Sequence, residues 1–159
     1  MNELEQISFY LGRAYYTYVG LLERVLVEMG LDQHIRPGMG NVLFALFEQD
    51  DRTISEVGQR LQLSRSTMTG MVAGIEKAGL ITTRRDPVDG RAVRLKLTPL
   101  ARSLEQRCRE VPDRIEKVLC RRCDAEKQMI LKVVLATMIE SMSEEVRRID
   151  LGEGKVRTR

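Results

Sequence analysis

The apolar residues change once from a helical period to strict alternation and back again, over residues 80–97. The segment VRLKL alternates apolar and basic residues, as expected for a strand with one buried face. Before it lie Asp86-Pro87 and Asp89-Gly90, pairs that favour turns because proline fixes φ and Asp-Gly tolerates positive φ. The sequence therefore predicts one β-hairpin with a long tip, set among helices.

Residues 3–29 predict a single long amphipathic helix. Asn2 and Glu5 have the spacing of a capping box, and Gly30 follows at a position where helices commonly end. Four of its residues recur every seven positions along one face: Leu4, Leu11, Tyr18 and Val25. A stripe of this length exceeds what a few short helices can cover, so it indicates contact with a partner surface.

Three shorter helices are predicted between this helix and the hairpin. Pro37 fits the first turn of the first one. Thr53 and Glu56 form a capping box at the start of the second, and Ser64 caps the third, which runs to about Ala78. The positions expected to face inward in the last two helices are Val57, Leu61, Met68, Met71, Val72 and Ile75.

Two long helices are predicted after the hairpin. Thr98 caps the first, in which Pro112 removes a backbone donor, so we expect a kink or a restart near Arg109. The second covers about residues 124–149 and contains MILKVVLATMIESM, which is apolar on nearly every side. In so small a protein, such a helix indicates burial against a second subunit. We expect residues 151–159 to form a disordered tail.

The order of short helix, three-residue turn, helix and hairpin is that of a winged helix-turn-helix. Its second helix fits the major groove of DNA, which is about 12 Å wide, and its hairpin reaches the adjacent backbone or minor groove. Gly58 supports this interpretation, since a small residue in the first helix lets the second helix cross it closely.

The charge distribution agrees with such a surface. Residues 62–98 carry seven basic and three acidic side chains, whereas residues 1–49 carry three basic and six acidic ones. A basic segment beside an acidic one is typical of a protein that binds nucleic acid. On charge alone, a solvated surface without a partner is the alternative.

The stretch LSRSTMTGMVAGIEKAGLITTRRDPVDGRAVRLKLTPLA resembles the core of the MarR family, the multiple antibiotic resistance regulators. In that family an Asp-x-Arg in the wing precedes an alternating strand and Leu-Thr, a pattern matched by Asp89, Arg91, Leu97 and Thr98. The long outer helices also fit, so the resemblance covers nearly the whole chain. The chain departs from the family's commonest pattern at Gln62, which replaces a turn glycine, and at Gly70, Gly74 and Gly90, where basic residues are frequent.

The resemblance implies a mainly α fold with a small β-hairpin wing, built as one domain over residues 1–159. Residues 1–36 and 99–150 would form interlocking dimerisation helices of an obligate homodimer, and residues 37–98 the DNA-binding region. Two winged modules would bind a palindromic operator on double-stranded DNA, as in a ligand-responsive repressor. The residues expected at the DNA are Ser64, Arg65, Ser66, Thr67, Thr69, Arg84, Arg85, Asp89, Arg91 and Arg94.

The wing residues have distinct expected roles. By similarity, Arg91 enters or flanks the minor groove and Asp89 orients it. Narrow A·T-rich minor grooves attract arginine, so the wing would read shape as well as charge. The alternating strand is pinned to the core by its apolar residues, so all four wing arginines are expected to face outward: Arg84, Arg85, Arg91 and Arg94.

The resemblance also implies a cleft for small aromatic or phenolic inducers. Arg13 and Tyr16 on the first helix, with His34 in the loop after it, are the candidate ligand contacts. A guanidinium can pair with a carboxylate or a phenolate, which suits such ligands. Packing between subunits is the alternative role for the tyrosines, and a surface position is the alternative for His34.

Cys120-Arg-Arg-Cys123, with Cys108 upstream, is the second chemical motif of the chain. Neighbouring arginines lower the pKa of a thiol and favour the reactive thiolate, which would suit a redox-sensing regulator. Ordinary thiols at a helix end and a metal site are the other interpretations. Three cysteines and one histidine lack the paired spacing of a structural zinc site.

Other classes of protein receive little support. The sequence has no Ser-His-Asp arrangement and no phosphate-binding glycine loop, so we expect no enzymatic activity and no cofactor. No apolar stretch approaches the roughly 20 residues of a membrane span, and the N-terminus MNELEQ is acidic, so we expect a cytoplasmic protein without a membrane partner. A winged helix that binds proteins and not DNA is the alternative function, and salt-dependent binding to duplex DNA would decide.

Overall fold

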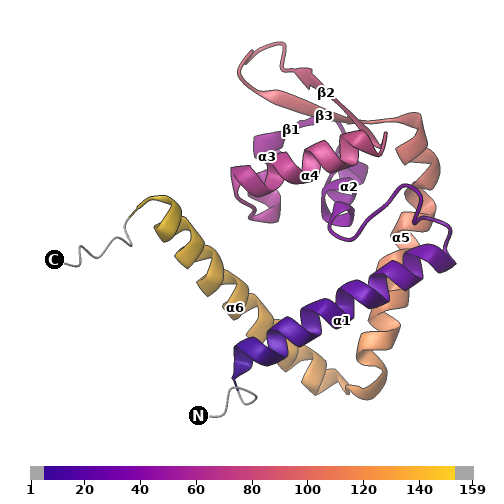
Figure 1. The fold of residues 1–159 in the computed structure, drawn as a ribbon, viewed down its shortest axis with the longest axis vertical. Helices are drawn as coiled ribbons and strands as arrows, with labels where there is room; N and C mark the ends of the chain where they lie inside the picture. The colour runs from indigo at the N-terminus through magenta and orange to yellow at the C-terminus, as the bar shows by residue number, and fades with distance from the viewer. Residues whose placement is uncertain (1–5, 153–159) are drawn as a thin grey trace. The chain divides into compact units, whose positions relative to one another are not determined.

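The computed structural model describes residues 6–152 as a mainly helical chain with one small sheet (Figure 1). It has two compact units, Met1–Glu116 and Lys117–Arg159. The elements are α1 (Ile7–Glu28), α2 (Met39–Glu48), β1 (Arg52–Thr53), α3 (Ile54–Leu61), α4 (Arg65–Lys77), β2 (Ile81–Arg85), β3 (Val93–Leu97), α5 (Pro99–Leu119), the 3-10 turn η2 (Cys120–Arg122) and α6 (Ala125–Asp150). The predicted fold class is confirmed. The predicted capping box at Asn2 and Glu5, and residues 153–159 of the predicted tail, lie outside the described residues.

The two ends of the loop between α1 and α2 compare differently with the prediction. Gly30 has φ 63° and follows the end of α1, as expected. α2 begins at Met39, and its N-cap Gly38 has φ 92°, in the left-handed region. A left-handed residue interrupts a right-handed helix, so Pro37 lies before α2 and its predicted place in the first turn is wrong.

The predicted caps of the helix pair α3 and α4 are confirmed. The backbone N–H of Thr53 donates to Glu56 Oε2 at 2.7 Å, and the N–H of Glu56 donates to Thr53 Oγ1 at 3.2 Å. Ser64 Oγ accepts from the N–H of Thr67 at 3.2 Å. These contacts satisfy N–H groups that have no partner inside their own helix, so both helices begin at defined residues.

The crossing of α3 and α4 depends on a small residue, as predicted. Gly58 is buried, and a Cβ added to it would lie 3.1 Å from Met68 Cγ. In the turn between the helices, Gln62 has φ 54°, a conformation that favours glycine. Gln62, which stands where the family usually has a turn glycine, therefore adopts a conformation that glycine would adopt at lower cost.

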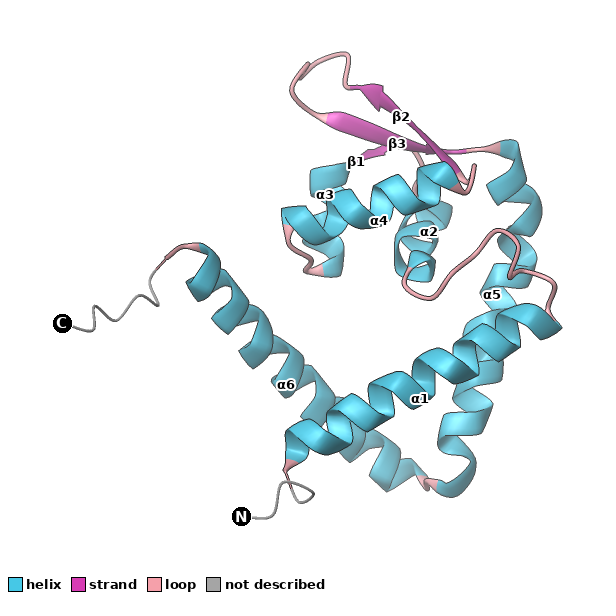
Figure 2. Ribbon diagram, viewed as in Figure 1, coloured by secondary structure: helices cyan, strands magenta, loops and turns pink. Residues whose placement is uncertain are grey.

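The hairpin is joined by a third, very short strand (Figure 2). β2 pairs with β3 in antiparallel fashion, with Ile81 opposite Leu97 and Arg85 opposite Val93. β1 pairs with the other side of β3, which gives the strand order β1-β3-β2. The sequence did not predict β1, because two residues are too few to show an alternating pattern. β3 is thus a central strand with neighbours on both sides.

α5 continues through Pro112 as one helix, so the predicted restart near Arg109 is wrong. Proline removes a single hydrogen bond, the one to the carbonyl of Cys108. Buried residues lie on the same face before and after the proline: Leu104, Cys108, Val111 and Ile115. Burial of this continuous face offsets the lost hydrogen bond and keeps the helix intact.

The core of the first unit draws on α2, α4, the sheet and α5. Leu46, Ile75 and Leu95 are among its fully buried side chains. Met68, Val72 and Ile75 place one face of α4 in this core, and the predicted fourth member of that face, Met71, is partly buried. The core therefore fixes α4 and the base of the hairpin together and leaves the opposite face of α4 in solvent.

α6 has no buried side chain. Asp124 caps it, since Asp124 Oδ1 accepts from the N–H of Lys127 at 2.9 Å. Its exposed large apolar residues include Met129, Ile130, Leu131, Val133, Val134 and Ile139. The burial expected for this helix is not provided by the described residues of one chain, so a second subunit stays its predicted source.

Candidate nucleic-acid interface

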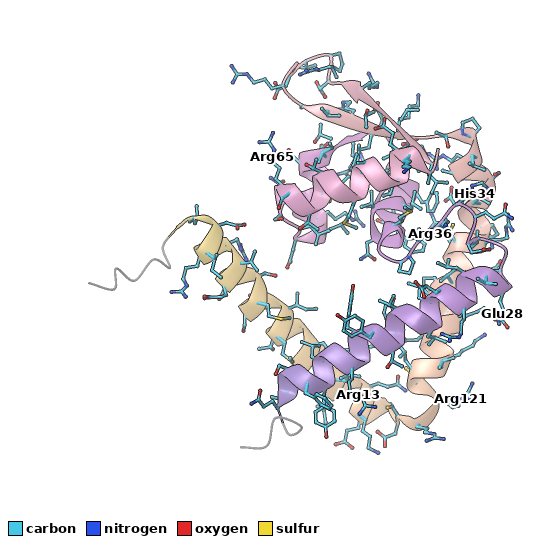
Figure 3. All side chains as sticks on the ribbon, viewed as in Figure 1. Arg13, Glu28, His34, Arg36, Arg65 and Arg121 are labelled. Atoms are coloured by element: carbon cyan, nitrogen blue, oxygen red, sulfur yellow. The ribbon has the colours of Figure 1, made fainter. Side chains whose placement is uncertain are left out.

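The N-terminal end of α4 carries one unpaired guanidinium group, that of Arg65, among hydroxyl groups that hydrogen-bond to one another or to the backbone. Ser64 Oγ lies 2.9 Å from Ser66 Oγ and 2.9 Å from Thr67 Oγ1. Thr69 Oγ1 donates to the carbonyl of Arg65 at 2.9 Å. The Arg65 guanidinium makes no hydrogen bond or ion pair with any described residue, and Figure 3 shows it projecting away from the helix. Arg65 is therefore available to an external acceptor, while the hydroxyl groups hold the helix start.

A buried carboxylate organises the wing tip. Asp86 is 8% exposed, and its Oδ1 accepts from the N–H groups of Val88 and Asp89 at 2.8 and 2.9 Å. These two bonds, and then the bond from Arg94, hold the pKa of the Asp86 carboxyl at about 2, below its ordinary value of 3.8. The turn is closed by this side chain. Gly90 does not have positive φ, so the expected use of positive φ at Asp89-Gly90 is wrong.

Arg91 is the wing arginine whose side chain is free. Asp89 Oδ1 accepts from the backbone N–H of Arg91 at 3.0 Å, so Asp89 holds the main chain at this position. The Arg91 side chain is exposed and makes no hydrogen bond or ion pair within residues 6–152. Arg85 Nη1 donates to the carbonyl of Gly90 at 2.9 Å, across the tip. The tip thus presents one guanidinium outward and uses another to close itself.

Arg94 does not face outward as predicted. Its Nε donates to Asp86 Oδ2 at 2.5 Å, its Nη1 donates to the carbonyl of Asp51, and its side chain is 27% exposed. Arg94 lies on the central strand β3, opposite Thr53 of β1 and Arg84 of β2. The reason for the error is that pairing of β1 with β3 brings Asp51, the residue before β1, next to Arg94, and an alternating pattern does not show this partner.

A pair of carboxylates just after α2, to which the sequence assigned no role, anchors the wing. Asp51 Oδ2 accepts from Arg84 Nη2 at 2.6 Å. Asp50 Oδ1 accepts from the N–H of Leu97 at 2.9 Å, and Asp50 Oδ2 accepts from Arg102 of α5 at 2.9 Å. We call Asp50 and Asp51 the acidic corner. Two adjacent aspartates in a chain that also has a basic hairpin are the sequence feature from which this anchor could have been predicted.

The three candidate ligand contacts do not come together. Arg13 and Tyr16 lie one turn apart on α1, where Tyr16 is exposed and its ring packs edge-on against Tyr15 at a centroid distance of 5.4 Å. The Arg13 guanidinium lies 5.7 Å from the ring centroid of Phe9. His34 lies beyond the other end of α1 (Figure 3). A helix rises about 1.5 Å per residue, so one small ligand cannot reach both Arg13 and His34 of the same chain.

The three cysteines differ in burial, and Cys108 is the buried one. Cys120 and Cys123 are partly buried at η2, where the N–H of Cys123 donates to the carbonyl of Cys120 at 3.1 Å. Burial raises the pKa of the Cys108 thiol to about 11, which disfavours its thiolate.

In the described part of the chain, no group of three or more His, Cys, Asp or Glu residues could hold a metal ion. Nor does any described helix combine the length and apolar character that crossing a membrane requires.

Comparison with known proteins identifies relatives of this chain. A family model described as "MarR family" matches residues 40–92, from α2 to the wing tip. The organic hydroperoxide resistance transcriptional regulator of Bacillus subtilis is 30% identical over 103 residues, which is 65% of this chain and 69% of the regulator. The transcriptional repressor IacR of Pseudomonas putida is 31% identical over 108 residues, 67% of this chain and 62% of the repressor.

A solved structure extends the match to most of the chain. The PcaV transcriptional regulator from Streptomyces coelicolor, crystallised with its natural ligand, superposes with a TM-score of 0.77 at 22% identity. The match covers 89% of this chain and 97% of that protein. The long helices on either side of the winged module therefore belong to the shared fold.

Proposed function

The chain belongs to the MarR family of transcription regulators, and on that premise we propose that it binds double-stranded DNA as a homodimer and acts as a repressor. One winged module would occupy each half-site of a palindromic operator, with the two recognition helices about 34 Å apart. The observation that carries the proposal is the pair of free guanidinium groups of Arg65 and Arg91, at the start of α4 and at the wing tip.

The two arginines are suited to different parts of the DNA. Arg65 stands at the N-terminal end of α4, the end of a recognition helix that reaches base edges. Arg91 lies at the end of a hairpin whose backbone is fixed by Asp86 and Asp89, so its guanidinium can enter or flank the minor groove. Arg94, which is tied to Asp86, is withdrawn from the proposed DNA contacts.

The dimer is proposed from the exposed apolar residues of the outer helices. α6 buries none of its side chains, and α1 exposes Ile7, Tyr10, Tyr15, Tyr16 and Val27. Exposed apolar residues in such numbers on a helix are rare in monomers and mark interaction surfaces. Sedimentation of the full chain tests this proposal, and a monomer at micromolar concentration would refute it.

We propose a small aromatic or phenolic acid as inducer, with Arg13 and Tyr16 as contacts and His34 withdrawn. PcaV is similar in fold and was crystallised with a ligand. Arg13 offers a guanidinium to a carboxylate, and Tyr16 offers an exposed ring beside it. A panel of benzoates and phenols, added to the protein–DNA complex, should release DNA from the wild type but not from Arg13→Ala.

DNA binding itself is tested by selecting duplexes from a random-sequence library with the wild-type protein. The expected product is a palindrome, bound with an affinity that falls steeply with salt. Failure to enrich any sequence, with a folded dimer, would overturn the proposed function.

A further inference from the structure

We propose that Gly70 is a specificity-determining residue of α4, at which the helix backbone itself lies against the base edges of the DNA. The inference rests on the proposed function, because it takes α4 as the helix that enters the major groove. It adds to that function a contact between the helix backbone and the DNA bases, which is possible because Gly70 has no side chain.

Gly70 lies at the centre of the exposed face of α4. The buried face of this helix carries Met68, Val72 and Ile75. Successive residues of an α-helix are about 100° apart, so Gly70 lies opposite the middle of that face. Its neighbours along the outer face, Ser66 and Ala73, are exposed as well. A groove that receives α4 by this face meets Gly70 first.

The protein itself gives no reason for a glycine at this position. A Cβ added to Gly70 would have no atom within 4 Å, and its φ is not positive. Gly58 differs, since a Cβ there would crowd Met68 at 3.1 Å. Gly74, also in α4, differs too, since a Cβ there would meet Met39 Cε at 3.6 Å.

A glycine inside an exposed helix weakens the free protein. It has more freedom to lose on folding than alanine, and it leaves the helix backbone open to water. Gly70 weakens the helix, and neither packing nor backbone conformation requires it. Its presence is explained if a bound partner occupies the space that a larger side chain would fill. Close approach of backbone to a ligand is one of the ordinary uses of glycine.

The chemistry of the contact follows from the groove. Thymine presents an apolar C5-methyl group at its major-groove edge. The Cα–H surface of Gly70 can lie against such a group, whereas an alanine methyl would hold the helix away from it. The neighbouring donors would then lose contact too, so the effect on a cognate site would exceed that of one lost apolar contact.

The test uses Gly70→Ala and the matched variant Gly74→Ala in the full-length protein. Both replace a glycine of the same helix, so both should raise the melting temperature by about 2–4 °C. Binding is measured by fluorescence anisotropy on two duplexes of equal length. One is the sequence enriched from a random library by the wild type, and the other is an unrelated sequence.

We expect Gly70→Ala to bind the enriched duplex about tenfold or more weakly than the wild type, and to bind the unrelated duplex equally well. Gly74→Ala should match the wild type on both. Equal binding of the enriched duplex by Gly70→Ala would overturn the inference, as would an equal loss in both variants or a lower melting temperature for Gly70→Ala. If the wild type enriches no sequence, the proposed function fails and the inference falls with it.

Discussion

Replacing Arg91 and Arg94 one at a time by glutamine should distinguish an arginine that contacts DNA, Arg91, from one that stabilises the wing by internal hydrogen bonds, Arg94. Both residues belong to the wing and both carry a full positive charge. Arg91 has no side-chain partner among the described residues, whereas Arg94 is bonded to Asp86 and Asp51. Only the free guanidinium can displace counterions from DNA. The two substitutions therefore remove the same charge with different expected consequences.

The size of the difference follows from counterion release. Each phosphate neutralised on duplex DNA contributes about 0.9 to the slope of log affinity against log salt. In the proposed homodimer, the loss of Arg91 from both wings should reduce that slope by up to about 1.8. Raising the salt from about 50 to about 200 mM would then weaken the variant about twelvefold less than the wild type. Arg94→Gln should keep the wild-type slope, while its affinity falls at every salt concentration because the wing tip is no longer held.

The assay is fluorescence anisotropy on the enriched duplex over a series of salt concentrations. Circular dichroism confirms that each variant is folded, and a thermal melt separates the two further. Arg94→Gln should melt at a lower temperature than the wild type, and Arg91→Gln at the same temperature. A slope reduced equally by both substitutions, or unchanged by Arg91→Gln, would refute this assignment of the wing arginines.

Three further predictions concern the fold that presents these residues. Gly58→Val should lower the free energy of unfolding, measured in urea, by about 1–3 kcal/mol, because a Cβ at this position would lie 3.1 Å from Met68 Cγ. In a protein that already carries Met68→Ala, the same Gly58→Val substitution should cost less. An equal cost in both backgrounds would contradict the close crossing of α3 and α4. Gln62→Gly should raise that free energy by about 0.5–1 kcal/mol, because φ is 54° there; Gln59→Gly, inside α3, should lower it. The Asp86 carboxyl has a pKa lowered to about 2 from 3.8, so its contribution to stability is complete above the unfolded value and declines as the pH falls from about 4 to about 2. Over this pH range the urea midpoint should fall less for Asp86→Asn than for the wild type. An equal fall in both proteins would exclude this role of Asp86.

The features that the sequence predicted correctly are specified by residues close together in the chain. The capping box at Thr53 and the cap at Ser64 involve residues three positions apart, and the two strands of the hairpin are joined by a short turn. Local patterns of this kind can be recognised without knowledge of the rest of the fold. The helix-turn-helix and the wing could therefore be placed before the structure was known.

The errors arise where distant residues decide the outcome. Arg94 is drawn inward by Asp51, 43 positions away along the chain, through a strand β1 too short to predict. α5 crosses Pro112 because the core holds the helix on both sides of it. The position of Gly38 before α2 depends on a left-handed backbone conformation at one residue. None of these is visible in a local pattern of apolar and polar residues.

The acidic corner has a mechanical consequence. Asp50 joins α5, through Arg102, to the last residue of β3, and Asp51 holds both Arg84 of β2 and Arg94 of β3. The hairpin is thus clamped at its base from two sides and closed at its tip by Asp86. Because Asp50 ties the hairpin to the N-terminal part of α5, we expect a rotation of that part of α5 to swing Arg91 at the tip with it. Loosening the clamp would uncouple that swing while leaving the charge of the tip unchanged.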